Sequence, residues 1–191
     1  MPQIFNILSR ALSIMLHPLF MPTYGMILYM AAMLVRTPNL PSIYIYTSVI
    51  TTFVLTALIP IILMLILWKR GSISSLHIDN ASERTTPYIY TLICFGFWCY
   101  FVGGILKMPV VWLVVAIGAT AALLAVTIIN RWWRISAHLT ALGGLLGGAF
   151  SIALYYSALP TLLIIGILIV SLLLMYARLY LNAHTPMQVV C

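Results

Sequence analysis

The stretch from Val110 to Ile129 reads VVWLVVAIGATAALLAVTII and contains no charged side chain. It matches the length of about 20 residues that a helix needs to cross a bilayer. The whole chain has 191 residues, of which 64% are hydrophobic and 6% charged, and its mean hydropathy is +1.15. A soluble domain carries roughly 25% charged residues and could not hide this much apolar surface. The composition therefore indicates an integral membrane protein.

Five further apolar segments flank this stretch. They cover residues 11–35, 43–68, 87–106, 136–156 and 160–181. Their runs are continuous, whereas the strands of a membrane barrel alternate in polarity, so we expect helices. The prediction is an all-α bundle of about six transmembrane helices that forms one domain over residues 1–191. The prolines of His17-Pro18 and Met21-Pro22 interrupt the first segment, which predicts a short interfacial piece followed by a span, or else one kinked span.

Charged residues are few and gather at the ends of the apolar segments. The net charge of +7 would suggest a nucleic-acid partner for a soluble protein. Here the basic side chains mark topology and lipid headgroups, so the expected partner is the bilayer and not nucleic acid. The three cysteines, Cys94, Cys99 and Cys191, have neither zinc-site nor disulfide-framework spacing. Nothing in the sequence indicates an oligomeric state.

Alternation of six spans places four polar segments on one side of the membrane. Residues 1–10, 69–87, 130–137 and 179–191 share this side, which we call face A, and residues 36–42, 107–109 and 157–160 share face B. The unusual polar residues belong to face A: His77, Asp79, Glu83, Arg84, Arg134, Ser136, His138, Arg178 and His184. Ionisable groups at membrane depth are costly, so this convergence predicts a functional site. The alternative is a set of ordinary loop residues, which suits the basic residues Lys69, Arg70, Arg131 and Arg134 best.

The residue types on face A suit phosphate chemistry. Arginine forks match phosphate oxygens, and Ser136, at the start of a span, could cap a helix whose N-terminus attracts anions. Two histidines can divide phosphoryl transfer, one attacking phosphorus and the other protonating the leaving oxygen. This chemistry requires no metal, and two acidic residues are too few for a typical magnesium site. We therefore expect neither a metal nor a cofactor.

Three short patterns resemble motifs of the type 2 phosphatidic acid phosphatases, the PAP2 superfamily. Residues 135–138, Ile-Ser-Ala-His, are similar to that family's Pro-Ser-Gly-His motif. Arg178 and His184 keep the family's Arg-to-His spacing, with Pro186 two residues after the histidine. His77 and Arg84 have the spacing of the family's Lys-to-Arg motif, with histidine in place of lysine. The resemblance covers residues 77–190 and implies a PAP2-like fold.

The resemblance also implies roles for these residues. His184 would be the nucleophile that forms a phosphohistidine, and His138 the general acid that protonates the leaving alcohol. The phosphate would be bound by Arg84, Ser136, Arg178 and His77. Family substrates are membrane lipid phosphates and pyrophosphates, so the partner would be a phosphorylated lipid and the location a bacterial cytoplasmic (inner) membrane.

Gln188 stands where the family has an aspartate that orients the nucleophilic histidine. Glutamine can accept a hydrogen bond from the ring but supplies no negative charge. Three functions therefore stay open: a lipid-phosphate phosphatase, a catalytically weak or inactive relative that binds phosphorylated lipid, and a membrane scaffold or transporter. Gly143-Gly144 and Gly147-Gly148 form a small-residue face that we interpret as close helix–helix packing.

The basic residues also predict how the bundle lies in the membrane. Face A carries Arg10, Lys69, Arg70, Arg84, Arg131, Arg134 and Arg178, and face B carries Arg36 and Lys107. The positive-inside rule places face A in the cytoplasm, whereas many bacterial members of the family have their site outside. In the family the third motif opens a further span. We therefore expect either that the C-terminus has been cut after Cys191 or that this last helix is missing.

Overall fold

The computed structural model describes residues 2–75, 81–156 and 161–190, and these form helices joined by short connections. The α-helices are α1 (Pro2–Met15), α2 (Met21–Arg36), α3 (Ser42–Phe53), α4 (Ile59–Lys69), α5 (Ala81–Tyr100), α6 (Val110–Ile129), α7 (Ala137–Tyr155), α8 (Thr161–Tyr180) and α9 (Pro186–Val190). A 3-10 turn, η1 (Pro18–Phe20), precedes α2, and π-helical segments η2 (Val54–Leu58) and η3 (Phe101–Ile105) follow α3 and α5. No strand occurs among the described residues.

Six helical stretches are long and apolar enough to cross a membrane. They are Gln3–Arg36, Ser42–Lys69, Glu83–Ile105, Val110–Ile129, Ala137–Tyr155 and Thr161–Tyr180. Large apolar side chains such as Val35, Leu154 and Leu162 point outward from them. Lipid tolerates this surface and water does not. The structure thus confirms the prediction of an all-α bundle with six membrane-length helices.

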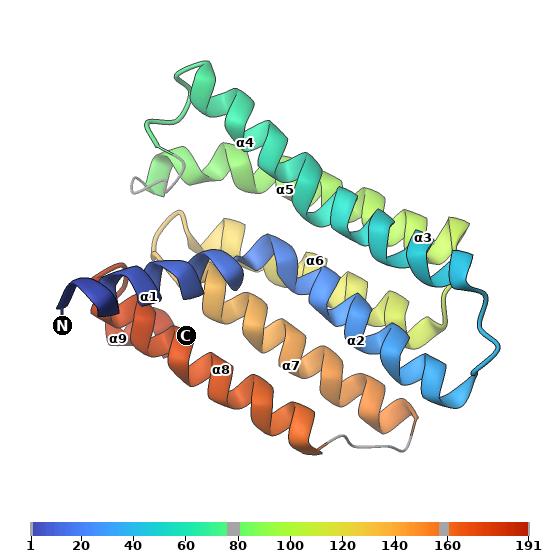
Figure 1. Cartoon of the computed structure of the whole chain (residues 1–191). Coiled ribbons are helices and arrows are strands. Elements are labelled where there is room, and N and C mark those ends of the chain that lie inside the picture. Colours follow the sequence, from blue (N-terminus) through green and yellow to red (C-terminus); the bar gives the residue numbers. More distant parts are fainter. Residues whose placement is uncertain (1, 76–80, 157–160, 191) are drawn as a thin grey trace.

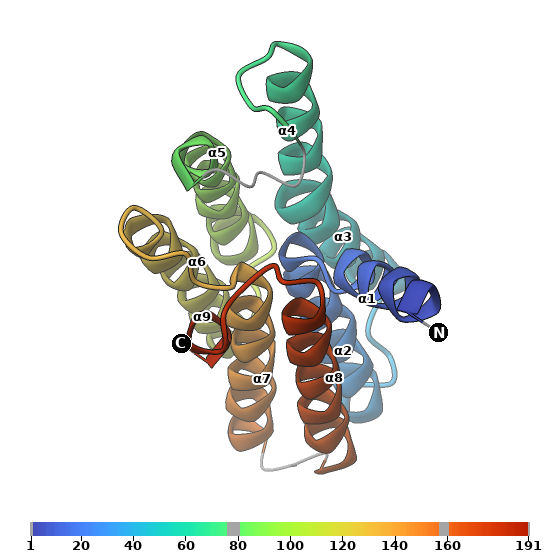
Figure 2. The same cartoon turned by 90° about the vertical axis from the view of Figure 1, so that its left-hand side faces the viewer.

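Two apolar clusters hold the bundle together. One lies between α2, α5 and α6 around Met26, Trp98 and Trp112. The other joins α2, α7 and α8. The Trp98 indole donates a hydrogen bond of 3.1 Å to the Thr52 hydroxyl, which attaches α5 to α3. The start of α5, the connection between α6 and α7, and the connection before α9 lie at the same end of the bundle, which is face A (Figures 1 and 2).

The first apolar segment divides into two helices, as the expected arrangement of a short interfacial piece followed by a span requires. α1 ends before Pro18 and packs against α8 rather than continuing into α2. Its small polar residues Ser9 and Ser13 are buried, while Ile4 and Ile7 face outward. This is the reverse of a helix that faces water, and it suits a helix lying at a lipid surface.

The apolar segment expected to begin at Pro87 belongs to a helix that starts before this proline. α5 starts earlier, at Ala81, and Pro87 lies inside it. A proline within a helix removes one backbone hydrogen bond, and polar residues around it concealed the first turns. As a consequence Arg84 is a helical residue one turn before Pro87 and not part of a loop.

The glycines of α7 do not all serve close helix packing, which corrects the interpretation of this face. A Cβ atom built at Gly143, Gly144 or Gly147 would meet nothing within 4 Å. At Gly148 it would lie 3.2 Å from Val115 of α6, which is a close helix contact. Most of this small-residue face therefore borders open space.

Candidate functional site

Four segments bring the predicted residues together on face A, the end that faces the viewer in Figure 2. Arg84 comes from the start of α5, and Ser136 from the connection that enters α7. Arg178 lies in the last turn of α8, and His184 in the connection to α9. Arg84, Ser136 and His184 are buried. His77 lies outside the described residues, so its predicted role as a phosphate ligand stays a prediction.

His184 sits among three arginines and is only 9% exposed. Burial, followed by the charges of Arg178, Arg134 and Arg84, lowers the pKa of His184 to about 4 from its usual 6.5. A hydrogen bond between the ring and the Arg134 backbone acts in the opposite direction but is outweighed. His184 is therefore neutral at physiological pH in the unliganded protein. A neutral imidazole among guanidinium groups has a lone pair available for nucleophilic attack.

Three polar side-chain atoms in this cluster are buried and have no hydrogen-bond partner among the described residues. They are Ser136 Oγ, Arg178 Nε and His184 Nδ1. Buried polar atoms in native proteins nearly always have partners, so three orphans in one cluster call for a ligand. The Arg178 Nε–H group and the Ser136 hydroxyl can donate hydrogen bonds, and His184 Nδ1 lies near three arginines. This set suits an anion with several oxygens.

Ser136 occupies the N-cap position of α7 as predicted, but its hydroxyl does not cap the helix. The Ser136 backbone N–H donates to the Gln188 carbonyl at 2.9 Å, and its carbonyl accepts from the Thr140 N–H at 3.0 Å. These two bonds fix the backbone and tie α7 to α9. The hydroxyl stays unengaged, at a helix N-terminus whose dipole attracts negative charge.

Arg84 makes a contact that the sequence did not reveal. Its side chain is hydrogen-bonded to Tyr88, which lies four residues further along α5. The (i, i+4) spacing is a usual helix pairing. It was missed because the helix was expected to begin at Pro87. Tyr88 therefore helps to hold the Arg84 guanidinium in the cluster.

His138 is held by the N-terminal helix, which no sequence pattern connected with the site. Because α1 ends at Met15, its last carbonyls lack helical partners. The Ser13 carbonyl instead accepts a hydrogen bond from His138 Nε2 at 3.1 Å. A carbonyl only accepts, so Nε2 carries the proton and Nδ1 is left to exchange one. The His17 ring lies 5.5 Å from the His138 ring in an edge-to-face arrangement.

Gln188 does not orient the His184 ring, which corrects the expected role of this residue. Its Oε1 accepts a hydrogen bond from the Thr185 N–H at 3.1 Å, and its own N–H donates to the Thr185 carbonyl at 3.0 Å. Gln188 thus makes the glutamine half of a capping box at the start of α9, with Pro186 at the first helical position. The glutamine shapes the backbone after His184, and His184 Nδ1 has no hydrogen-bond partner within residues 2–75, 81–156 and 161–190.

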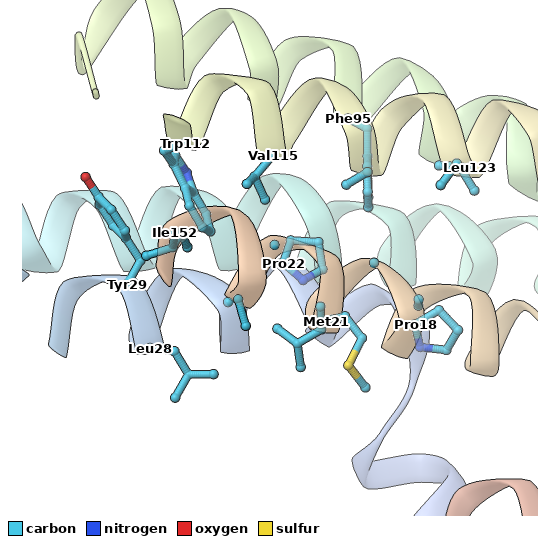
Figure 3. Close-up of a pocket in the computed structure, with 18 of the residues that line it drawn as sticks. Pro18, Met21, Pro22, Leu28, Tyr29, Phe95, Trp112, Val115, Leu123 and Ile152 are labelled. Carbon is cyan, nitrogen blue, oxygen red and sulfur yellow. The ribbon is translucent and has the colours of Figure 1, made fainter. Parts of the chain in front are cut away.

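An apolar cavity extends from the neighbourhood of this cluster into the bundle (Figure 3). Side chains of η1, α2, α5, α6 and α7 line it, with Thr91, Ala137 and Thr140 near face A and Arg36 and Tyr156 near face B. Figure 3 shows Trp112, Val115, Phe95 and Leu123 along one wall and Pro18, Met21, Pro22 and Tyr29 along another. The cluster around His184 therefore lies near a space suited to hydrocarbon.

Comparisons with protein-family models, with curated proteins and with solved structures give no match to this chain.

Proposed function

We propose that the protein is a phosphatase of membrane lipid phosphates or pyrophosphates, of the PAP2 type, that acts through a phosphohistidine. One observation carries the proposal: Ser136 Oγ, Arg178 Nε and His184 Nδ1 are buried, have no hydrogen-bond partner in the described parts of the chain, and lie in a cluster that also holds Arg84 and Arg134. A phosphate group has the charge and the acceptor oxygens to engage such a cluster. The adjoining apolar cavity is what a lipid, rather than a soluble phosphate ester, would require.

The proposed reaction has two steps. His184 Nδ1 attacks phosphorus, the bond from phosphorus to the leaving oxygen breaks, and protonated His138 gives the Nδ1 proton to that oxygen. Water then attacks phosphorus, His138 takes a proton from the water, and the phosphorus–nitrogen bond breaks to release phosphate and regenerate His184. Arg84, Ser136 and Arg178 hold the phosphate oxygens through both steps.

The same proposal places the protein in a bacterial cytoplasmic membrane. The positive-inside distribution favours face A, and hence the site, on the cytoplasmic side. Labelling of single cysteines introduced on Ser72 and Lys107 in intact cells tests this, because only one of the two faces is reachable from outside. Ser72 lies on the face A side and Lys107 on the face B side. We expect Lys107→Cys to react with an impermeant reagent and Ser72→Cys to be protected.

A second candidate, a protein that binds phosphorylated lipid without hydrolysing it, has one observation in its favour. Gln188 is engaged with Thr185, so the side chain that follows the nucleophile neither orients His184 nor supplies a charge to its ring. Loss of a comparable partner in a serine-protease triad lowers turnover about 10⁴-fold. Binding would survive such a loss while turnover would not.

Phosphate release from several lipid phosphates by the purified full chain separates these candidates. We expect release by the wild type and a loss of about 10³-fold or more in His184→Ala. The matched control is Met187→Ala, three residues away with a side chain 63% exposed, which should keep its activity. Equal rates in the wild type and His184→Ala would contradict the enzyme. No release, together with thermal stabilisation by a non-hydrolysable lipid phosphonate, would favour the binding protein.

A further inference from the structure

The cavity runs along the entire length of α7. Residues of this helix recur on its wall every third or fourth position, among them Ala137, Ala141, Gly144, Gly148, Ile152 and, just after the helix, Tyr156. At 1.5 Å per residue the distance from the first to the last is about 28 Å. That length approaches the roughly 30 Å hydrocarbon thickness of a whole bilayer, and it is about twice the thickness of one leaflet.

The cavity is narrow and is kept open by glycines. It leaves about 170 Å³ for the centre of a water-sized sphere, which over such a length is room for one hydrocarbon chain and not for two. A Cβ at Gly144 would project into open space, with nothing within 4 Å. At Gly25 of α2 it would already meet Leu145 and Trp112 at 3.4 Å. Larger side chains at these positions would obstruct the space.

The two ends of the cavity differ in chemistry. At the face A end, Ala137 is flanked in sequence by Ser136 and His138, so the cavity begins beside the cluster around His184. At the face B end the cavity is lined by Tyr29, Arg36 and Tyr156, which are bonded to one another. The Tyr156 hydroxyl lies 3.1 Å from both the Tyr29 hydroxyl and Met33 Sδ. The Arg36 guanidinium is hydrogen-bonded to the Tyr156 carbonyl and lies 5.1 Å from the centre of its ring.

We propose that this cavity holds one hydrocarbon chain of a phosphorylated lipid, and that this chain is longer than one leaflet is thick. The proposal rests on the proposed function for the position of the phosphate and on the cavity for the chain. An acyl chain confined to one leaflet would leave the half nearer Tyr156 empty, and an unfilled apolar space loses packing contacts on every wall. A longer chain fills it and reaches the Tyr29–Tyr156 end. The substrate class is thus a single long-chain lipid phosphate, polyisoprenoid or linear, rather than a diacyl lipid of ordinary chain length.

Photo-crosslinking tests the placement without requiring turnover. Two non-hydrolysable long-chain phosphonates, one polyisoprenyl and one linear alkyl, each carry a diazirine about 28 Å from the phosphorus, the length of the cavity. We expect crosslinks at cavity residues Tyr29, Ile152 or Tyr156 by peptide mass spectrometry, and the probe that labels them more strongly identifies the chain type. Crosslinks at the neighbouring lipid-facing Leu154, which is 76% exposed, in place of the cavity residues would overturn the proposal.

A glycine pair provides the matched variants. Gly144 lines the cavity and Gly143 does not, while a Cβ at either meets nothing within 4 Å. We expect Gly144→Leu to abolish the cavity crosslinks and to lower hydrolysis of a long-chain phosphate at least tenfold, with hydrolysis of a hexyl phosphate unchanged. Gly143→Leu should behave like the wild type in all three measurements. Equal behaviour of the two variants would overturn the chain cavity even where phosphatase activity is present, and crosslinking without activity would leave the cavity standing and remove the enzyme.

Discussion

The two ends of the helical bundle use arginine in opposite ways. On face B, Arg36 is hydrogen-bonded to the Tyr156 carbonyl and lies over its ring, and the Tyr156 hydroxyl is paired as well. On face A, Arg178 Nε is buried and lacks a hydrogen-bond partner among the described residues, as do Ser136 Oγ and His184 Nδ1. One buried atom near face B, Trp112 Nε1, also lacks such a partner. The paired arginine on face B thus stabilises the fold, while the buried polar atoms on face A are available to bind an anion.

Substitution of the arginine at each end by alanine should give the largest difference in activity between the two faces. Arg178→Ala should lower kcat/KM for a short-chain lipid phosphate about 10- to 100-fold, because a hydrogen bond to a charged group is worth about 1.5–3 kcal/mol. Arg36→Ala should leave that kcat/KM within about twofold, since its contacts are remote from the phosphate. Steady-state phosphate release measures both. Similar losses in the two variants would show that the ends do not differ in function.

On face A, the stability and the kcat/KM of the protein should depend on pH through His184. The pKa of His184 is about 4 in the folded chain and about 6.5 when the chain is unfolded. The unfolded state therefore binds the proton first, and stability should fall as pH decreases from 6.5 to 4 and level off below that range. The acid limb of kcat/KM that reports His184 should likewise have its midpoint near 4 and not near 6.5.

Thermal unfolding in detergent measures the stability part of this prediction. His184→Gln removes the titrating group and should flatten the dependence between pH 6.5 and pH 4. A His184→Gln protein with an unchanged pH dependence would mean that other groups cause it.

The capping box at Gln188 should give the smallest effect. Gln188→Glu keeps an acceptor at the third helical position and should keep both stability and activity. Gln188→Ala removes the bond to the Thr185 N–H and should lower the unfolding temperature by about 2 °C, since a lost cap costs about 1 kcal/mol. Differential scanning fluorimetry checks this. A loss of activity in Gln188→Glu as large as that in Arg178→Ala would instead give Gln188 a chemical role.

The spans and the convergence on face A could be predicted because both follow from one-dimensional patterns. Hydropathy located the six apolar stretches, and their alternation placed Arg84, Ser136, Arg178 and His184 at one end. The contact between Ser13 and His138 could not be predicted, because it depends on where α1 folds back and on a backbone carbonyl that no side-chain pattern marks. The capping role of Gln188 could be predicted from the pattern Thr-x-x-Gln. The same position also matches the family's aspartate, which predicts a different role. The cavity could not be predicted, because glycines that leave a space open and glycines that bring helices together give the same sequence pattern.

The most direct test of the central claim is to trap phosphate on the chain. A single turnover of a long-chain lipid phosphate labelled in its phosphorus, stopped in alkali, should leave the label on the peptide that contains His184, as an acid-labile phosphoramidate. His184→Ala should carry no label, and His138→Ala should acquire the label more slowly than the wild type, because His138 protonates the leaving oxygen. Turnover by the wild type with no label on His184 would contradict the account.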